Sequence, residues 1–129
     1  MNWKKNLTAL TVAGIALSGS IVANAGTSWS KTEYLSVPGH NGSTTSSTQN
    51  KSKSNASSDL KVTSVSKKNS IDVRAIGGAG QGTGAWVRNV NTGSYAIPNP
   101  VKAGHATQLQ YSSDLTSPNI SMGTKWKSN

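Results

Sequence analysis

Cysteine and phenylalanine are both absent from the 129 residues, and only four residues are acidic. Because there is no thiol, the chain forms no disulfide, so hydrophobic burial and hydrogen bonding must hold the fold together. Two histidines and four scattered acids do not match the ligand patterns of zinc or calcium sites. Paired-carboxylate catalysis needs two acids at one cleft, and no spacing here brings two together. We therefore expect no metal, no cofactor and no enzymatic activity.

Residues for nucleophilic catalysis are also scarce. Without cysteine, a serine or threonine nucleophile needs a histidine as general base. His40 lies in a Ser-rich stretch, His105 stands at the start of an expected strand, and neither stands in a G-x-S-x-G setting. The alternative to a protein without enzymatic activity is a secreted hydrolase that uses His105 together with an acid. The glycine run 77–84 lacks the Lys-Ser/Thr pair of a phosphate-binding P-loop and favours a hairpin connection instead.

The first 25 residues have the pattern of an export signal. Two lysines precede an almost uncharged stretch over residues 7–22, and Ala-Asn-Ala at 23–25 places small residues where a signal peptidase cleaves. We predict cleavage after Ala25 and a secreted protein, extracellular or associated with the cell wall. A retained membrane anchor is the alternative, since the apolar stretch approaches the roughly 20 residues that span a bilayer.

The charge balance is strongly basic, with 13 Lys and Arg and a formal net charge of +9. Without residues 1–25 the chain keeps 11 of these basic residues and all four acids, which leaves a formal charge of +7. Such an excess favours polyanionic partners. For an exported chain these are wall polymers and anionic membrane surfaces, so we expect no nucleic acid. Export without cysteine favours a Gram-positive bacterium.

The chain after residue 25 divides by composition near residue 59. Residues 26–38 contain a partial alternation that ends at Pro-Gly, and we expect a first strand there. Residues 39–58 are rich in Ser, Thr and Asn and nearly free of apolar side chains. Such a segment is either a mobile linker or an edge ribbon with both faces in water. Residues 59–129 form the β-rich domain.

Short runs of alternating apolar and polar residues follow residue 59, as in half-buried strands. Turn signals separate them at intervals of about ten residues, and no segment has a helical period with caps. The chain therefore predicts an all-β fold, a small antiparallel β-sandwich or barrel. The expected strands are 60–65, 71–76, 85–90, 94–97, 105–111 and 120–126.

Aromatic and basic residues recur side by side and are the candidate binding residues. Arg88 stands two positions after Trp86, so both point to one face of a strand, whereas Lys125 and Lys127 flank Trp126. Tryptophan beside cations suits an anionic envelope surface. The opposing interpretation is that Trp86 and Trp126 fill the core of a domain without phenylalanine. The candidate envelope-binding residues are Trp29, Lys67, Lys68, Arg88, Lys125, Trp126 and Lys127.

Three short motifs follow the expected signal: Gly-Thr-Ser-Trp at 26–29, Gly-Ala-Trp-Val-Arg-Asn at 84–89 and Met-Gly-Thr-Lys-Trp at 122–126. With the signal, they resemble small secreted proteins of Gram-positive bacteria that include lactococcin-type bacteriocins. The resemblance implies a β-sandwich and, for the bacteriocins, interference with wall synthesis through a cell-wall precursor. The chain departs from the family in the Ser-rich insert at 39–58 and in the residues that follow its last aromatic.

These observations lead us to expect a secreted, non-enzymatic, bacteriocin-like protein that binds anionic components of a bacterial cell envelope. Its partner would be a cell wall polymer, a wall precursor or an anionic membrane surface. The alternative is a structural or adhesive surface protein of the producing bacterium, with residues 39–58 as a spacer.

Overall fold

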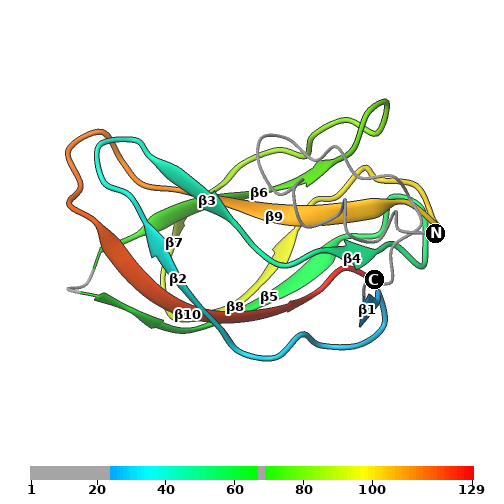
Figure 1. Cartoon of the computed structure of the whole chain (residues 1–129), viewed down its shortest axis with the longest axis horizontal. Helices are drawn as coiled ribbons and strands as arrows, with labels where there is room; N and C mark the ends of the chain where they lie inside the picture. The colour runs from blue at the N-terminus through cyan, green and yellow to red at the C-terminus, as the bar shows by residue number, and fades with distance from the viewer. Residues whose placement is uncertain (1–23, 67–68) are drawn as a thin grey trace, which may run out of the picture.

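A computed structural model describes residues 24–66 and 69–129, and these form a sandwich of two β-sheets without an α-helix (Figure 1). The predicted all-β fold is confirmed, and the architecture is the sandwich. The strands are β1 (Asn24–Ala25), β2 (Glu33–Val37), β3 (Ser43–Thr45), β4 (Gln49–Asn50), β5 (Ser58–Val65), β6 (Ile71–Gly77), β7 (Val87–Val90), β8 (Gly93–Ile97), β9 (Ala106–Ser112) and β10 (Ile120–Lys127).

The two sheets each have a central strand from the C-terminal part of the chain. One sheet has four strands in the order β2-β10-β5-β8, all antiparallel. The other has six strands in the order β1-β4-β9-β6-β7, and β3 also pairs with β9. The β1–β4 pairing is parallel. In Figure 1, β6 and β9 cross the upper part of the molecule and β5 and β10 the lower part.

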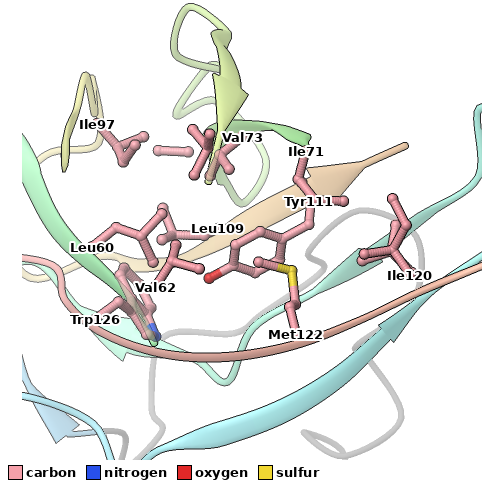
Figure 2. Packing of buried hydrophobic residues seen from close by; sticks show 13 residues of the cluster. Leu60, Val62, Ile71, Val73, Ile97, Leu109, Tyr111, Ile120, Met122 and Trp126 are labelled. Atoms are coloured by element: carbon pink, nitrogen blue, oxygen red, sulfur yellow. The ribbon is translucent and has the colours of Figure 1, made fainter. Parts of the chain in front are cut away.

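Alternation along the strands decides which side chains enter the core (Figure 2). On β6, Ile71, Val73 and Ala75 are fully buried, so the residues between them point away from the core. The same rule applies to β10, where every second residue from Ile120 to Trp126 is buried. Burying large apolar side chains contributes roughly 1.5–3 kcal/mol each. The buried cluster consists of Val37, Leu60, Val62, Ile71, Val73, Ala75, Val90, Ile97, Leu109, Tyr111, Ile120, Met122 and Trp126.

The sequence suggested a core position for two tryptophans, and only one of them lies in the core. Trp126 has no exposed surface and is among the largest buried side chains. Trp86 is half-buried and lies just before β7, where its ring packs against Arg74. The core interpretation is therefore confirmed for Trp126 and wrong for Trp86, because an arginine on the outer side of β6 covers the ring instead of apolar side chains.

Residues 39–58 contribute β3 and β4, which both pair with β9, and Ser58 begins β5. The segment therefore lies along one edge of the six-stranded sheet. Of the expected signal, only Asn24 and Ala25 fall within the described residues, where they form β1. Among the described residues there is no helix long and apolar enough to cross a membrane.

The glycine-rich segment 77–84 connects β6 and β7, which pair antiparallel, so the predicted hairpin is confirmed. Gly80 and Gly82 have φ values of 81° and 79°, in the left-handed region that glycine adopts without steric cost. These glycines shape a tight return of the chain into a second strand, whereas the glycines of a P-loop lead into a helix.

Candidate functional site

The outer surface of the four-stranded sheet carries lysines on adjacent strands. Lys125 on β10 is paired directly with Lys61 on β5, and Lys127 with Asp59. Side chains at such positions have Cβ atoms about 4.5–5.5 Å apart, and like charges there repel. Lys127 is balanced by Asp59, with 3.6 Å between Nζ and Oδ2. Neither Lys61 nor Lys125 forms an ion pair with any acid of the described chain, so their ammonium groups are available to an external anion.

Trp29 lies over the lysines of β10. The Nζ atoms of Lys125 and Lys127 are 5.8 Å and 5.2 Å from the centre of its ring. Both distances fall within the range of about 6 Å in which a ring attracts a cation. Trp29 as a residue is 42% exposed, so it contacts two ammonium groups and still offers apolar surface to a ligand.

Ser30 fixes Trp29 in this position. The backbone N–H of Ser30 donates to the carbonyl of Trp126 at 2.8 Å, and the N–H of Trp126 donates to Ser30 Oγ at 3.0 Å. Ser30 is itself buried. The segment before β2 is thus bonded to β10 at the residue between the two lysines, which places the preceding tryptophan above them.

Tyr34 extends the same surface along β10. The residue is 82% exposed, and it is paired with Gly123 across the β2–β10 ladder. A Cβ atom on Gly123 would lie 3.4 Å from Cε1 of the tyrosine ring, so the ring lies beside β10 at this position. We call this outer surface the lysine face and define it by Trp29, Tyr34, Lys61, Lys125 and Lys127.

An open hollow of about 600 Å³ adjoins Trp29. In it, Glu33 accepts hydrogen bonds from the backbone N–H of Ser47, at 3.0 Å, and from the Ser47 hydroxyl. Lys31 adds a further exposed cation beside the ring. The hollow is lined by Trp29, Ser30, Lys31, Thr32, Glu33 and Ser47. It gives the lysine face room for a ligand group next to the tryptophan.

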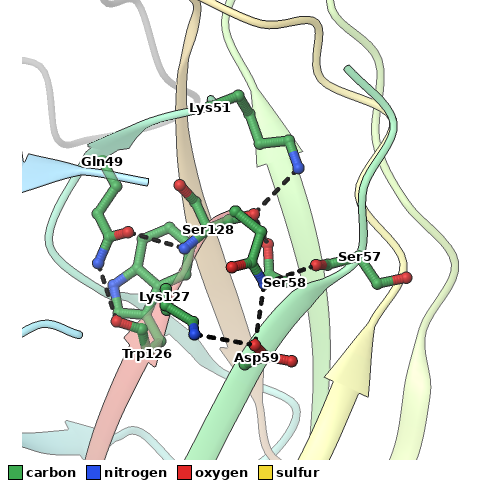
Figure 3. Close-up of polar contacts among 9 residues, drawn as sticks. Gln49, Lys51, Ser57, Ser58, Asp59, Trp126, Lys127 and Ser128 are labelled. Carbon is green, nitrogen blue, oxygen red and sulfur yellow. Dashed lines mark hydrogen bonds and ion pairs between the residues drawn. The ribbon is translucent and has the colours of Figure 1, made fainter. Parts of the chain in front are cut away.

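A buried polar network holds the end of β10 (Figure 3). Gln49 Nε2 donates to the carbonyl of Trp126 at 2.9 Å, and its Oε1 accepts from the N–H of Ser128 at 2.7 Å. Lys51 Nζ and Ser58 Oγ both donate to the carbonyl of Ser128, at 3.0 Å each. Burial lowers the pKa of Lys51. These bonds fix the backbone on both sides of Lys127 and thereby the geometry of the lysine face.

The six-stranded sheet carries a second group of cations and one aromatic ring. The guanidinium carbon of Arg74 lies 4.4 Å from the centre of the Trp86 ring, and that of Arg88 lies 5.9 Å from it. Arg74 Nε donates to Gln110 Oε1 at 2.7 Å, and Arg88 pairs with Asp72 at 2.8 Å. We call Arg74, Trp86 and Arg88 the arginine cluster. Arg88 was among the predicted binding residues and Arg74 was not, although the alternation of β6 already points Arg74 away from the core.

The structure brings together three of the predicted binding residues, Trp29, Lys125 and Lys127. Arg88 lies on the other sheet. Trp126 is fully buried, so its ring cannot contact a ligand, in contrast to the expectation; alternation along β10 turns it inward when its neighbours point out. Lys67 and Lys68 lie outside the described residues. Lys61 and Tyr34 were not predicted, because only strand pairing places them beside β10.

The histidines have ordinary surroundings. Nδ1 of His40 lies 3.2 Å from the carbonyl oxygen of Leu115, in a turn, and His105 is exposed. Within residues 24–66 and 69–129 no group of three His, Cys, Asp or Glu side chains is arranged to hold a metal ion.

No family model and no curated protein matches the chain. Among solved structures it is similar to the CBM36-1 domain of a multidomain xylanase from the hindgut metagenome of Trinervitermes trinervoides. The two share 14% identity over 78% of this chain and 87% of that domain, with a TM-score of 0.38. A similarity of this degree carries no inference about what the present chain binds.

Proposed function

We propose that this protein is a non-enzymatic binding protein that attaches to an anionic polymer of the bacterial cell envelope through its lysine face. The observation that supports this most is the like-charge pair of Lys61 and Lys125, which repels within the protein and would be relieved by an anion. A fold that keeps two unpaired lysines opposite each other gives up some stability, and binding an anion regains it.

The shape of the lysine face favours a polymer over a single small ion. Lys125 and Lys127 are two residues apart on one strand, which separates their positions by about 7 Å along β10. Trp29 and Tyr34 are exposed rings on the same surface and offer flat apolar contact to the carbon backbone of a sugar or polyol. A phosphodiester-linked wall polymer has both parts, namely repeated negative charge and carbon units between the charges. We therefore take this class as the ligand.

Binding of the purified protein to wall teichoic acid at low salt tests the proposal. We expect the double substitution Lys61→Gln and Lys125→Gln to weaken binding by about tenfold or more, since it removes roughly 1.4 kcal/mol or more of attraction. The matched control is Lys53→Gln with Lys102→Gln, which removes the same charge from two exposed lysines in loops. Equal loss in both double variants would mean that only net charge matters, and absence of binding by the unaltered protein would refute the proposal.

We further propose that this binding is used against neighbouring bacteria and that the protein is secreted and bacteriocin-like. This rests on the resemblance of the motifs at 26–29, 84–89 and 122–126, of which the first and last contribute to the lysine face. Purified protein added to lawns of related Gram-positive bacteria is expected to inhibit growth. Envelope binding without inhibition, together with retention on the producing cells, would favour the adhesive alternative instead.

A further inference from the structure

The sandwich has a second outer surface, and we propose that the arginine cluster on it is a second anion-binding site, so that one molecule bridges two segments of phosphodiester polymer. This inference rests on the proposed function, because it assigns a second site for the same class of ligand. Bridging adds an activity that a single binding face does not have, the cross-linking of polymer strands.

Arg74 is the group that would receive the phosphate. Its guanidinium carbon lies 4.4 Å from the centre of the Trp86 ring, and its Nε donates to Gln110 Oε1 at 2.7 Å, so the group is held on two sides. No acid within the described ranges forms an ion pair with it. A guanidinium held in this way presents its remaining N–H groups in a fixed fork, which matches the oxygens of a phosphate group.

The shape of the neighbouring strand β7 lets Arg88 pair with Asp72, so that Arg74 has no acidic partner among the described residues. Between the pairs Ile71–Val90 and Val73–Val87, the single residue Asp72 faces both Arg88 and Asn89. This bulge puts Asn89 at a φ of 57° and directs two donors to the Asp72 carboxylate, Arg88 Nη1 at 2.8 Å and the Asn89 N–H at 3.1 Å. Both oxygens of the carboxylate therefore accept a hydrogen bond from β7, and its ion pair is with Arg88, not with Arg74.

The two cationic surfaces face opposite directions. Arg74 alternates with buried Val73 and Ala75 on β6, and Lys125 and Lys127 alternate with buried Trp126 on β10. The side chains between the two sheets form the core, and packed sheets are about 10 Å apart. One anionic group therefore cannot reach both surfaces, and a second polymer segment must occupy the second one.

Agglutination of microspheres that carry purified wall teichoic acid separates bridging from binding. We expect the unaltered protein to agglutinate the microspheres. The amount of Arg74→Glu that binds to the microspheres, measured as its depletion from solution, should lie within about twofold of that of the unaltered protein, since the lysine face is distant and intact. The concentration of this variant that gives half-maximal turbidity should be about tenfold or more above that of the unaltered protein, because one molecule no longer links two spheres. Lys102→Glu makes the same charge change on an exposed loop and is the matched control.

Each result decides the question. Agglutination by Arg74→Glu equal to that of the unaltered protein overturns the second site, as does binding of the unaltered protein without agglutination. Absence of any binding refutes the proposed function itself. Self-association of the protein could also cause agglutination, and sedimentation of each protein tests for it. If the unaltered chain is a dimer that Arg74→Glu dissociates, self-association explains the turbidity and the inference fails. Trp86→Ala, which frees the Arg74 fork without changing charge, is expected to reduce agglutination in the same direction.

Discussion

Lys51 is a buried cation whose Nζ forms no ion pair with a described acid. The ammonium donates hydrogen bonds to the carbonyls of Ala56 and Ser128, the latter at 3.0 Å. Burial of a charge is costly, and carbonyl oxygens offset only part of this cost, which is why burial lowers the Lys51 pKa. The residue joins the loop before β5 to the end of β10, so it supports the backbone that carries Lys127.

Replacing Lys51 by methionine is expected to lower the free energy of unfolding by about 2 kcal/mol, because the Ala56 carbonyl loses its side-chain donor and the Ser128 carbonyl keeps only one of two, Ser58 Oγ. Chemical denaturation at pH 7 measures this. Lys53→Met, at an exposed neighbouring position, is expected to change stability by less than about 0.5 kcal/mol. A Lys51→Met variant as stable as the original would show that the cost of burying the charge balances its hydrogen bonds.

The same residue predicts a pH dependence. The unfolded chain holds the Lys51 proton with the ordinary pKa of 10.5, whereas burial lowers the pKa in the folded state. Between these two values the unfolded state binds more protons, so this group makes the free energy of unfolding rise as the pH increases toward 10.5. We expect the stability difference between the original protein and Lys51→Met to widen from pH 8 to pH 10. A difference that narrows over this range would contradict the assignment.

Tyr111 has the opposite effect at still higher pH. Burial, and to a smaller extent the negative charge of Glu33, raises the pKa of its phenol above the ordinary 10.0. Above pH 10 the unfolded chain loses this proton and the folded chain keeps it, so stability falls by up to roughly 1.4 kcal/mol per pH unit from this group. Tyr111→Phe is expected to remove this part of the decline between pH 10 and 11, measured by denaturant unfolding. Parallel declines in both proteins would refute it.

At the scale of the elements, alternation within a strand is a local property, and it could be read from the sequence for β6, β9 and β10. The pairing of strands is not local: Lys61 meets Lys125 only because β5 lies beside β10, and Trp29 covers β10 only through Ser30. For this reason the lysines of β10 were predicted as site residues, whereas Lys61 and Tyr34 on the neighbouring strands were not. The half-burial of Trp86 likewise depends on Arg74, a neighbour on another strand.

The hairpin connection from β6 to β7 packs closely against the segment after β8, and a substitution in it tests this packing. A Cβ atom on Gly84 would lie 2.3 Å from the carbonyl oxygen of Pro98, a backbone atom that cannot turn aside. Gly84→Ala is therefore expected to cost about 1–3 kcal/mol and to disturb Trp86 two residues later. Gly80→Asn is the control, since nothing lies within 4 Å of a Cβ there and asparagine tolerates its φ of 81°. Thermal unfolding of the two variants compares them; equal melting temperatures would contradict the contact.

For the whole molecule, the composition of the chain suggests a polar segment followed by a compact β-domain, but the two sheets combine strands from both parts. β10 lies between β2 and β5, and β9 pairs with β3, β4 and β6. Gln49 and Lys51 bond to the backbone of residues 126 and 128. The N-terminal strands are therefore needed to pair the central strands of both sheets and to complete the network below the lysine face.

A fragment that begins at residue 59 is accordingly expected not to fold by itself. Without β2, β3 and β4, one side of β10 and one side of β9 lose their ladder partners, and unpaired strand edges expose backbone groups that associate with other chains. We expect this fragment to lack dispersed amide signals in NMR spectra and to aggregate, whereas a chain that begins at residue 24 folds. Adding a peptide of residues 24–58 is expected to restore the native spectrum, because the missing strands return as a separate chain. A well-dispersed spectrum of the fragment alone would show that residues 59–129 form a complete domain without the N-terminal strands.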